Sequence, residues 1–188
     1  MDTNLENTNC ELINISGVGD ANDITNVISQ YPYWIQMNIP ETLTIPEEKP
    51  DMEQINSINI SVNIFRSEVI KVPKSPVDTT GNYIPNLEGK ISTGRKIIIQ
   101  GELCQKVVYT ANEAEQSVHS AHFYVPFSSY IIVPSEILFN NELTATDSLY
   151  VAFQVNSCIE NVTARMLDPR TILKQVTLLL FAVPEKSL

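Results

Sequence analysis

Residues 58–64 read INISVNI, and this stretch decides the fold class. Isoleucine or valine occupies every even position, and asparagine or serine occupies every odd one. Because successive side chains of a β-strand point to opposite faces, alternation with one polar face is typical of a half-buried strand. The stretch therefore predicts a strand that packs one face on a core and turns the other to solvent.

The same alternation recurs along the chain. Apolar side chains at odd positions of residues 33–39 alternate with Trp34, Gln36 and Asn38. Further strands are expected at residues 95–110, about 117–125, 130–133, 148–155, 159–167 and 171–183. The last segment is rich in β-branched residues and is followed by Pro184, which favours a strand over a helix.

Proline and turn residues separate these segments. An acidic connection with three prolines is expected at residues 40–50, a long connection at residues 71–94, and a turn at Asp168-Pro169. About seven to nine strands with few helices predict an all-β protein. We expect an antiparallel β-sandwich or a barrel-like domain with at most one or two short helices.

The first thirty residues differ from the rest of the chain. They are polar and acidic, and we interpret residues 1–30 as an N-terminal arm and residues 31–188 as one β domain. Within the arm, Ile24, Val27 and Ile28 recur at helical spacing after two candidate caps, Asp20 and Asn22. This pattern predicts one short helix whose apolar stripe packs on the domain or on a neighbouring molecule.

Charge and hydropathy exclude several classes of function. The net charge is −10, and residues 1–53 carry ten carboxylates and one lysine, so we expect neither a nucleic-acid partner nor an anionic membrane surface. No run reaches the roughly 18 apolar residues that span a bilayer, so we expect no membrane insertion. The first residues, MDTNLENTNC, lack the basic and apolar pattern of a secretory signal, which predicts synthesis in a cytoplasm without a signal peptide.

The cysteines and histidines are few. Cys10, Cys104 and Cys158 lie far apart, without the spacing of a metal site, and are either free thiols or cross-links between molecules. His119 and His122 are three residues apart, so on a strand their rings point to opposite faces and do not converge on a metal. We expect no metal and no cofactor. A nucleophile–base pair of Cys104 with either histidine lacks a third, orienting group.

An aromatic group with a proline bend follows the histidines. It includes Phe123, Pro126, Phe127 and Tyr130. Inward alternation of Ala121, Phe123 and Val125 assigns the group to the core, and a protein interface is the alternative because aromatic side chains anchor such surfaces.

Four stretches of the sequence carry a resemblance to a known family. They are KPDMEQI (49–55), LEGKISTGRKIII (87–99), QGELCQKVVYTANEAEQSVHSAHFYVPFSSYIIVP (100–134), within which VHSAHF and VPF (118–127) stand out, and MLDPRTI (166–172). Together they resemble the SPOCS domain of clostridial spore coat proteins, including the SipL-type morphogenetic proteins, over roughly residues 40–183. No LysM module, which SipL-type proteins carry, follows in this sequence.

The resemblance implies a β-rich structural module of the spore coat or exosporium, made in the mother-cell cytoplasm and placed on the spore surface. Four residues match family positions: Lys49, Pro50, Asp51 and Arg170. We expect them to fix loops through charge-assisted hydrogen bonds rather than to react.

Three hypotheses on function follow. The favoured one is a non-enzymatic structural protein that assembles with itself or docks to other spore coat proteins through a sheet face, a sheet edge or the arm. The second is a binding module that recruits one coat protein or glycan without self-association. The third is a hydrolase that uses Cys104 and a histidine.

Overall fold

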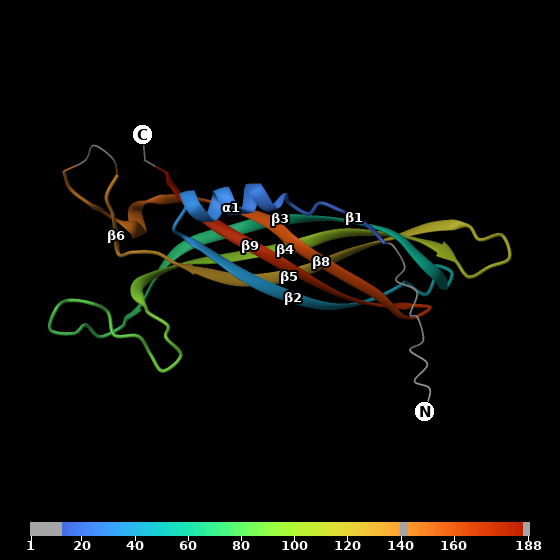
Figure 1. Ribbon diagram of the computed structural model, residues 1–188, viewed down its shortest axis with the longest axis horizontal. Helices are drawn as coiled ribbons and strands as arrows, with labels where there is room; N and C mark the ends of the chain where they lie inside the picture. Colours follow the sequence, from blue (N-terminus) through green and yellow to red (C-terminus); the bar gives the residue numbers. More distant parts are fainter. Residues whose placement is uncertain (1–12, 140–142, 186–188) are drawn as a thin grey trace, which may run out of the picture.

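The computed structural model describes residues 13–139 and 143–185 as an all-β sandwich with one short α-helix (Figure 1). The elements are β1 (Asn14–Ser16), α1 (Ala21–Gln30), β2 (Trp34–Thr44), β3 (Met52–Lys74), β4 (Thr93–Ala111), β5 (Val118–Ile132), β6 (Glu136–Ile137), β7 (Thr146–Asp147), a 3₁₀ turn (Ser148–Tyr150), β8 (Ala152–Asp168) and β9 (Thr171–Glu185). The predicted fold class, an antiparallel sandwich or barrel-like domain, is confirmed in its sandwich form.

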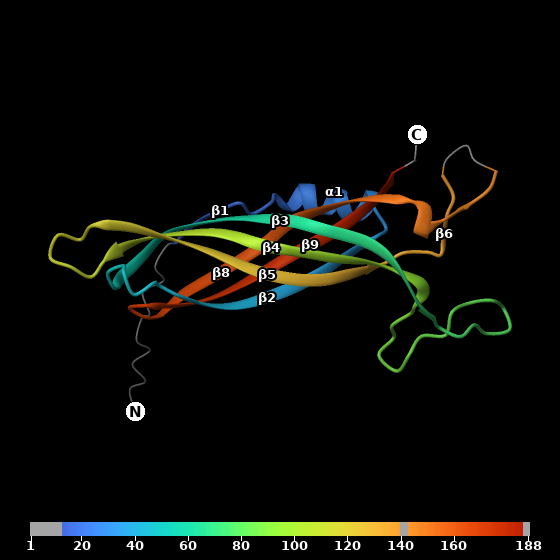
Figure 2. The same ribbon diagram turned by 180° about the vertical axis from the view of Figure 1, so that it is seen from behind.

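Two sheets form the layers of the sandwich. One has the strand order β1-β3-β4-β5 and the other the order β2-β9-β8, while β6 and β7 form a small separate ribbon. The β1–β3 pair is parallel, and the other pairs of the described strands are antiparallel. Seen from behind, the long strands of the two layers cross at an angle, and loops project from both ends of an elongated molecule (Figure 2).

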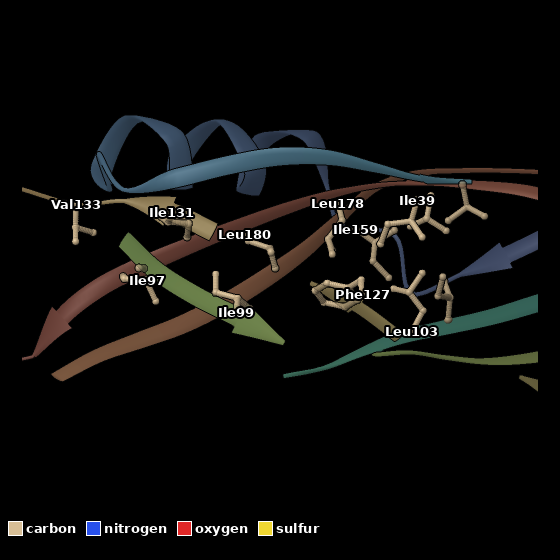
Figure 3. Close-up of a cluster of buried hydrophobic side chains, with 14 residues drawn as sticks. Ile39, Ile97, Ile99, Leu103, Phe127, Ile131, Val133, Ile159, Leu178 and Leu180 are labelled. Atoms are coloured by element: carbon tan, nitrogen blue, oxygen red, sulfur yellow. The ribbon is translucent and has the colours of Figure 1, made fainter. Parts of the chain in front are cut away.

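The core lies between the two sheets. In β4, every second residue from Ile97 to Ala111 is buried, which is the burial pattern of a strand with one face on a core. Side chains from both sheets meet there, including Ile99 and Leu103 from β4 and Leu178 and Leu180 from β9 (Figure 3). A second apolar cluster lies further along the same strands, around Leu43, Val107 and Ile172.

Two of the predicted strand boundaries are wrong at prolines. The strands expected at residues 117–125 and 130–133 are parts of one strand, β5 (Val118–Ile132), which continues through Pro126. The β2 strand likewise continues through Pro40 to Thr44, so the connection before β3 is shorter than residues 40–50. Both strands lie at the edge of a sheet, where the missing N–H of proline interrupts no ladder.

The segments at residues 148–155 and 159–167 are also wrongly divided. Residues 148–150 form a 3₁₀ turn, and β8 then runs unbroken from Ala152 to Asp168. A β-bulge between Ile159 and Asn161 shifts the register by one residue, which interrupts the alternation on which the prediction relied.

The described part of the arm lies on the domain. β1 pairs with β3, the N–H of Gly19 donates to the carbonyl of Ile159 at 2.8 Å, and α1 contacts β8 (Figure 1). Asp20 caps the helix by accepting from the Asn22 N–H at 2.7 Å. Gly17 has a φ of +100° and approaches the backbone of β3 so closely that any side chain would meet the Ile60 carbonyl oxygen.

These contacts place residues 14–30 along the side of the sandwich where β3 and β8 lie next to each other. The division into an arm and a domain stays a prediction. No helix of the described residues is long and apolar enough to cross a membrane.

Candidate functional site

The β2–β3, β4–β5 and β8–β9 connections lie at the same end of the sandwich (Figure 1), and Arg170 belongs to the β8–β9 connection. One guanidinium nitrogen donates to Asp51 Oδ1 at 2.5 Å and to the Lys49 carbonyl at 3.3 Å. The other donates to the carbonyls of Ile45 and Pro46 at 3.1 and 2.6 Å. The planar guanidinium therefore fixes the β2–β3 connection through four acceptors, and we name this set the Arg170 clamp.

Further hydrogen bonds tie the neighbouring connections to the clamp. The Met52 N–H donates to the Pro169 carbonyl at 2.7 Å, and the Asn112 N–H donates to the Asp51 carbonyl at 2.8 Å. The Tyr109 hydroxyl donates to the Pro50 carbonyl at 3.1 Å. Lys49, Pro50, Asp51 and Arg170 are thus brought together.

The two histidines lie apart. His119 is half-buried, stacks on Tyr109 with 5.9 Å between ring centroids, and shares a hydrogen bond of 2.9 Å with the Ser117 hydroxyl. His122 is exposed on the other face of β5. Within residues 13–139 and 143–185, no group of three or more histidine, cysteine or acidic side chains is arranged to hold a metal ion.

Cys104 and His122 line one shallow hollow on the outer face of the β3–β4–β5 sheet, together with Lys106 and Tyr124. The sulfur of Cys104 lies 3.9 Å from Glu102 Oε1. Burial, and then the neighbouring carboxylate, raise the pKa of the Cys104 thiol, whereas a nucleophilic cysteine needs a lowered pKa. The position does not favour a thiolate.

Cys158 is a half-buried free thiol, and burial raises its pKa. It packs so closely against the arm that a side chain at position 19 would come within 2.3 Å of its sulfur. Cys10 lies outside the described residues, so a cross-link between molecules stays a prediction for all three cysteines.

The aromatic group divides between the two faces of β5. Phe123 and Phe127 point into the core, and the Phe127 ring lies over Gly101, where a Cβ atom would come within 2.6 Å of the ring. Pro126 is exposed on the outer face, two residues from Tyr124, which is 64% exposed. Phe65, which is 60% exposed, lines a shallow hollow with Pro126. We name Phe65, Tyr124 and Pro126 the outer patch.

A third polar cluster lies inside the sandwich. Glu41 of β2 and Lys174 of β9 are directly paired in register, and their side chains are 2% and 0% exposed. Lys174 Nζ lies 3.2 Å from Glu41 Oε2, and Gln105 Nε2 of the other sheet donates to the same oxygen at 2.7 Å. We name these three residues the interior triad.

The interior triad is not among the sites predicted from the sequence. Glu41 was assigned to an acidic connection because it follows Pro40. Lys174 stands between Ile172 and Val176, two apolar residues of the same face, and this inward position is the signal that could have revealed it.

The opposite end of the sandwich holds one more ion pair. Arg95 donates to both carboxylate oxygens of Asp147, at 3.1 and 3.0 Å from one nitrogen. The backbone N–H of Leu149 and then Arg95 hold the pKa of Asp147 below its usual value. The pair joins β4 to the connection between β5 and β8.

The described residues thus form an all-β sandwich with a hydrogen-bonded clamp at one end and exposed aromatic side chains on one face. The model of the SipL SPOCS-domain family matches residues 51–166, and the chain belongs to this family. The membership associates the protein with sporulation. Lys49, Pro50 and Arg170 lie outside the matched residues. No curated protein and no solved structure matches the chain.

Proposed function

We propose that the protein is a non-enzymatic structural component of the spore envelope, in the coat or the exosporium. It is made in the mother cell, placed on the spore surface, and held there by contacts with copies of itself and with other coat proteins. The observation that carries this proposal is the outer patch, which lies on the long sheet of a chain that belongs to a sporulation family.

The outer patch has the chemistry of a binding surface. Its two aromatic side chains, Phe65 and Tyr124, are largely exposed, and aromatic residues contribute strongly to binding at protein interfaces. Gln100 and Ser128 lie beside Phe65 and Pro126 in one shallow hollow, and Glu102, which pairs in register with Pro126, accepts a hydrogen bond of 3.0 Å from Asn63 next to it. A partner that covers this surface would bury apolar area and would have to offer the Glu102 carboxylate a hydrogen-bond donor or a cation.

The sheet edges formed by β5 and β2 are less suited to assembly than the outer sheet face, because they discourage the addition of another strand. β5 and β2 are edge strands that contact each other, and each contains a proline, Pro126 and Pro40. Proline on an edge strand removes a backbone donor and discourages pairing with another chain. On the other side, the Ile159 carbonyl of β8 is already bonded by Gly19. These features favour assembly through the sheet face.

Electron microscopy of concentrated, purified full-length protein tests the proposal. We expect regular particles, fibres or sheets, because a face that binds a second copy of the chain produces closed oligomers or an open array. A deletion of residues 1–12 serves as a matched control, since it leaves every described contact of the arm in place. The deletion should assemble like the full chain. A strictly monomeric full-length protein at high concentration would contradict self-assembly and favour a module for a single coat partner.

A further inference from the structure

The interior triad is incompletely hydrogen-bonded. Glu41 Oε2 contacts both Lys174 Nζ and Gln105 Nε2, but Glu41 Oε1, Gln105 Oε1 and the Lys174 ammonium have no hydrogen-bond partner of good geometry. All three groups are buried. A buried ion pair is stable only when further hydrogen bonds satisfy its remaining atoms, so this arrangement is costly as it stands.

The triad also lies at a particular place in the core. On each of its three strands, the polar residue is flanked two positions away by one residue of each apolar cluster. The flanking residues are Ile39 and Leu43 on β2, Leu103 and Val107 on β4, and Ile172 and Val176 on β9. Apolar side chains therefore enclose the triad on both sides, and an amine, a carboxamide and a carboxylate are held together away from bulk water.

We propose that this triad is the site of an intramolecular isopeptide bond between Lys174 and Gln105, with Glu41 carrying the proton. The bond would join β9 of one sheet to β4 of the other. The contacts supply one group for each role: a nucleophilic amine, an amide carbon as electrophile, and a carboxylate that touches both nitrogens.

The reaction is balanced within the triad. The Lys174 ammonium gives one proton to the Glu41 carboxylate and becomes a neutral amine. Its nitrogen lone pair attacks Cδ of Gln105, a new C–N bond forms, and the bond from Cδ to Nε2 breaks. The second amine proton passes to the departing nitrogen by way of the Glu41 carboxyl group. The products are a secondary amide, one ammonia molecule and a protonated Glu41, and no oxidant or cofactor is consumed.

The buried setting favours both the attack and the product. Burial lowers the pKa of Lys174, although the nearby Glu41 carboxylate opposes this change, so the neutral amine is more accessible than in water. The reactants place two charges inside the core, whereas the products are neutral. Ammonia that escapes to solvent makes the step irreversible in practice. The inference is independent of the outer patch, and its failure would leave the proposed function unaffected.

Intact-mass spectrometry of the denatured full-length protein is the first test. The isopeptide bond predicts a mass lower than that of the sequence by one ammonia, about 17 Da. Fragmentation of a protease digest should then yield one branched peptide in which residues 105 and 174 are joined. A mass equal to that of the sequence, or unlinked peptides that contain Lys174 and Gln105, would overturn the proposal without any variant.

Three variants separate this bond from loss of ammonia elsewhere in the chain. Lys174→Arg keeps the positive charge but removes the amine, and Glu41→Gln removes the proton carrier, so both should show the full mass of their sequences. Lys106 follows Gln105 on β4 and lies on the outer face. The Lys106→Arg variant should therefore still have a mass lower than that of its sequence by one ammonia. A Lys174→Arg variant whose mass is still lower by one ammonia would contradict the proposal.

Discussion

The two faces of β4 offer the clearest contrast in the molecule. On the inner face, Ile97, Ile99 and Leu103 are fully enclosed by the opposite sheet. On the outer face of the same strand, Gln100 and Cys104 stand beside the exposed side chains of the outer patch. One strand thus holds the fold together with one set of side chains and lies under the proposed binding surface with the other. If the proposed function is correct, substitutions on the two faces should change stability and assembly separately.

The largest effect is expected from truncation on the inner face. Ile99→Ala removes a fully buried side chain and should lower the free energy of unfolding by about 2–5 kcal/mol. Its neighbour Ile98 lies on the outer face, opposite Tyr130, so Ile98→Ala should cost less than half as much. Urea unfolding of both variants measures the difference. Equal losses would contradict the assignment of the two faces.

A smaller loss is expected from adding one methyl group to the inner face. Gly101→Ala places a Cβ atom within 2.6 Å of the Phe127 ring and 2.8 Å of the Asn63 carbonyl oxygen. Overpacking of this kind should destabilise the fold by about 1–3 kcal/mol. Phe127→Leu removes the ring, so in the double variant it should offset part of the free energy of unfolding that Gly101→Ala costs. Urea unfolding measures the difference. A double variant that is less stable than the sum of the single changes would refute this packing.

The Arg170 clamp tests whether the ends of the sandwich contribute as well as its faces. Arg170→Gln removes the charged donors of four hydrogen bonds and should cost about 2 kcal/mol in urea unfolding. The exposed Arg66, paired with Glu68 on β3, is the matched control, and Arg66→Gln should cost at most about 0.5 kcal/mol. Similar small costs for both variants would show that the clamp is not a structural element.

The smallest expected effect is on the dependence of the Tm on pH. The pKa of Asp168 is lowered mainly by the Arg170 N–H, and that of Asp147 mainly by the Leu149 N–H. Both carboxylates therefore contribute stability above their unfolded pKa values, and this stability is lost as the pH falls through the folded values. The Tm should decrease between pH 5 and pH 2, and the decrease should be smaller in an Asp147→Asn, Asp168→Asn double variant. An identical decrease in both proteins would argue against this linkage.

Strands with uninterrupted alternation could be predicted from the sequence, and their boundaries at irregular positions could not. The strands predicted at residues 58–64 and 95–110 lie within β3 and β4. They could be predicted because period-two burial depends only on local spacing. Pro126 was interpreted as a bend, because its tolerance depends on β5 being an edge strand, which is a property of the whole sheet. The bulge near Asn161 is set by pairing with β9 and has no local signal.

Among the polar sites, too, some residues could be predicted from the sequence and others could not. Asp51 and Arg170 could be singled out by resemblance to family motifs, although 119 positions separate them. Glu41, Gln105 and Lys174 could not, because their meeting depends on the register of β2 against β9 and on the stacking of one sheet on the other. Phe65 of the outer patch was also missed, because it occupies a bulge between Ile64 and Arg66.

Sedimentation velocity over a range of concentrations tests most directly whether the chain associates with itself through the outer patch. The comparison is between the full chain and a Phe65→Ser, Tyr124→Ser double variant, whose equal urea midpoints would establish that both are folded. We predict that the sedimentation coefficient of the full chain rises with concentration while that of the variant stays at the monomer value. A folded variant that associates as strongly as the full chain would contradict the account.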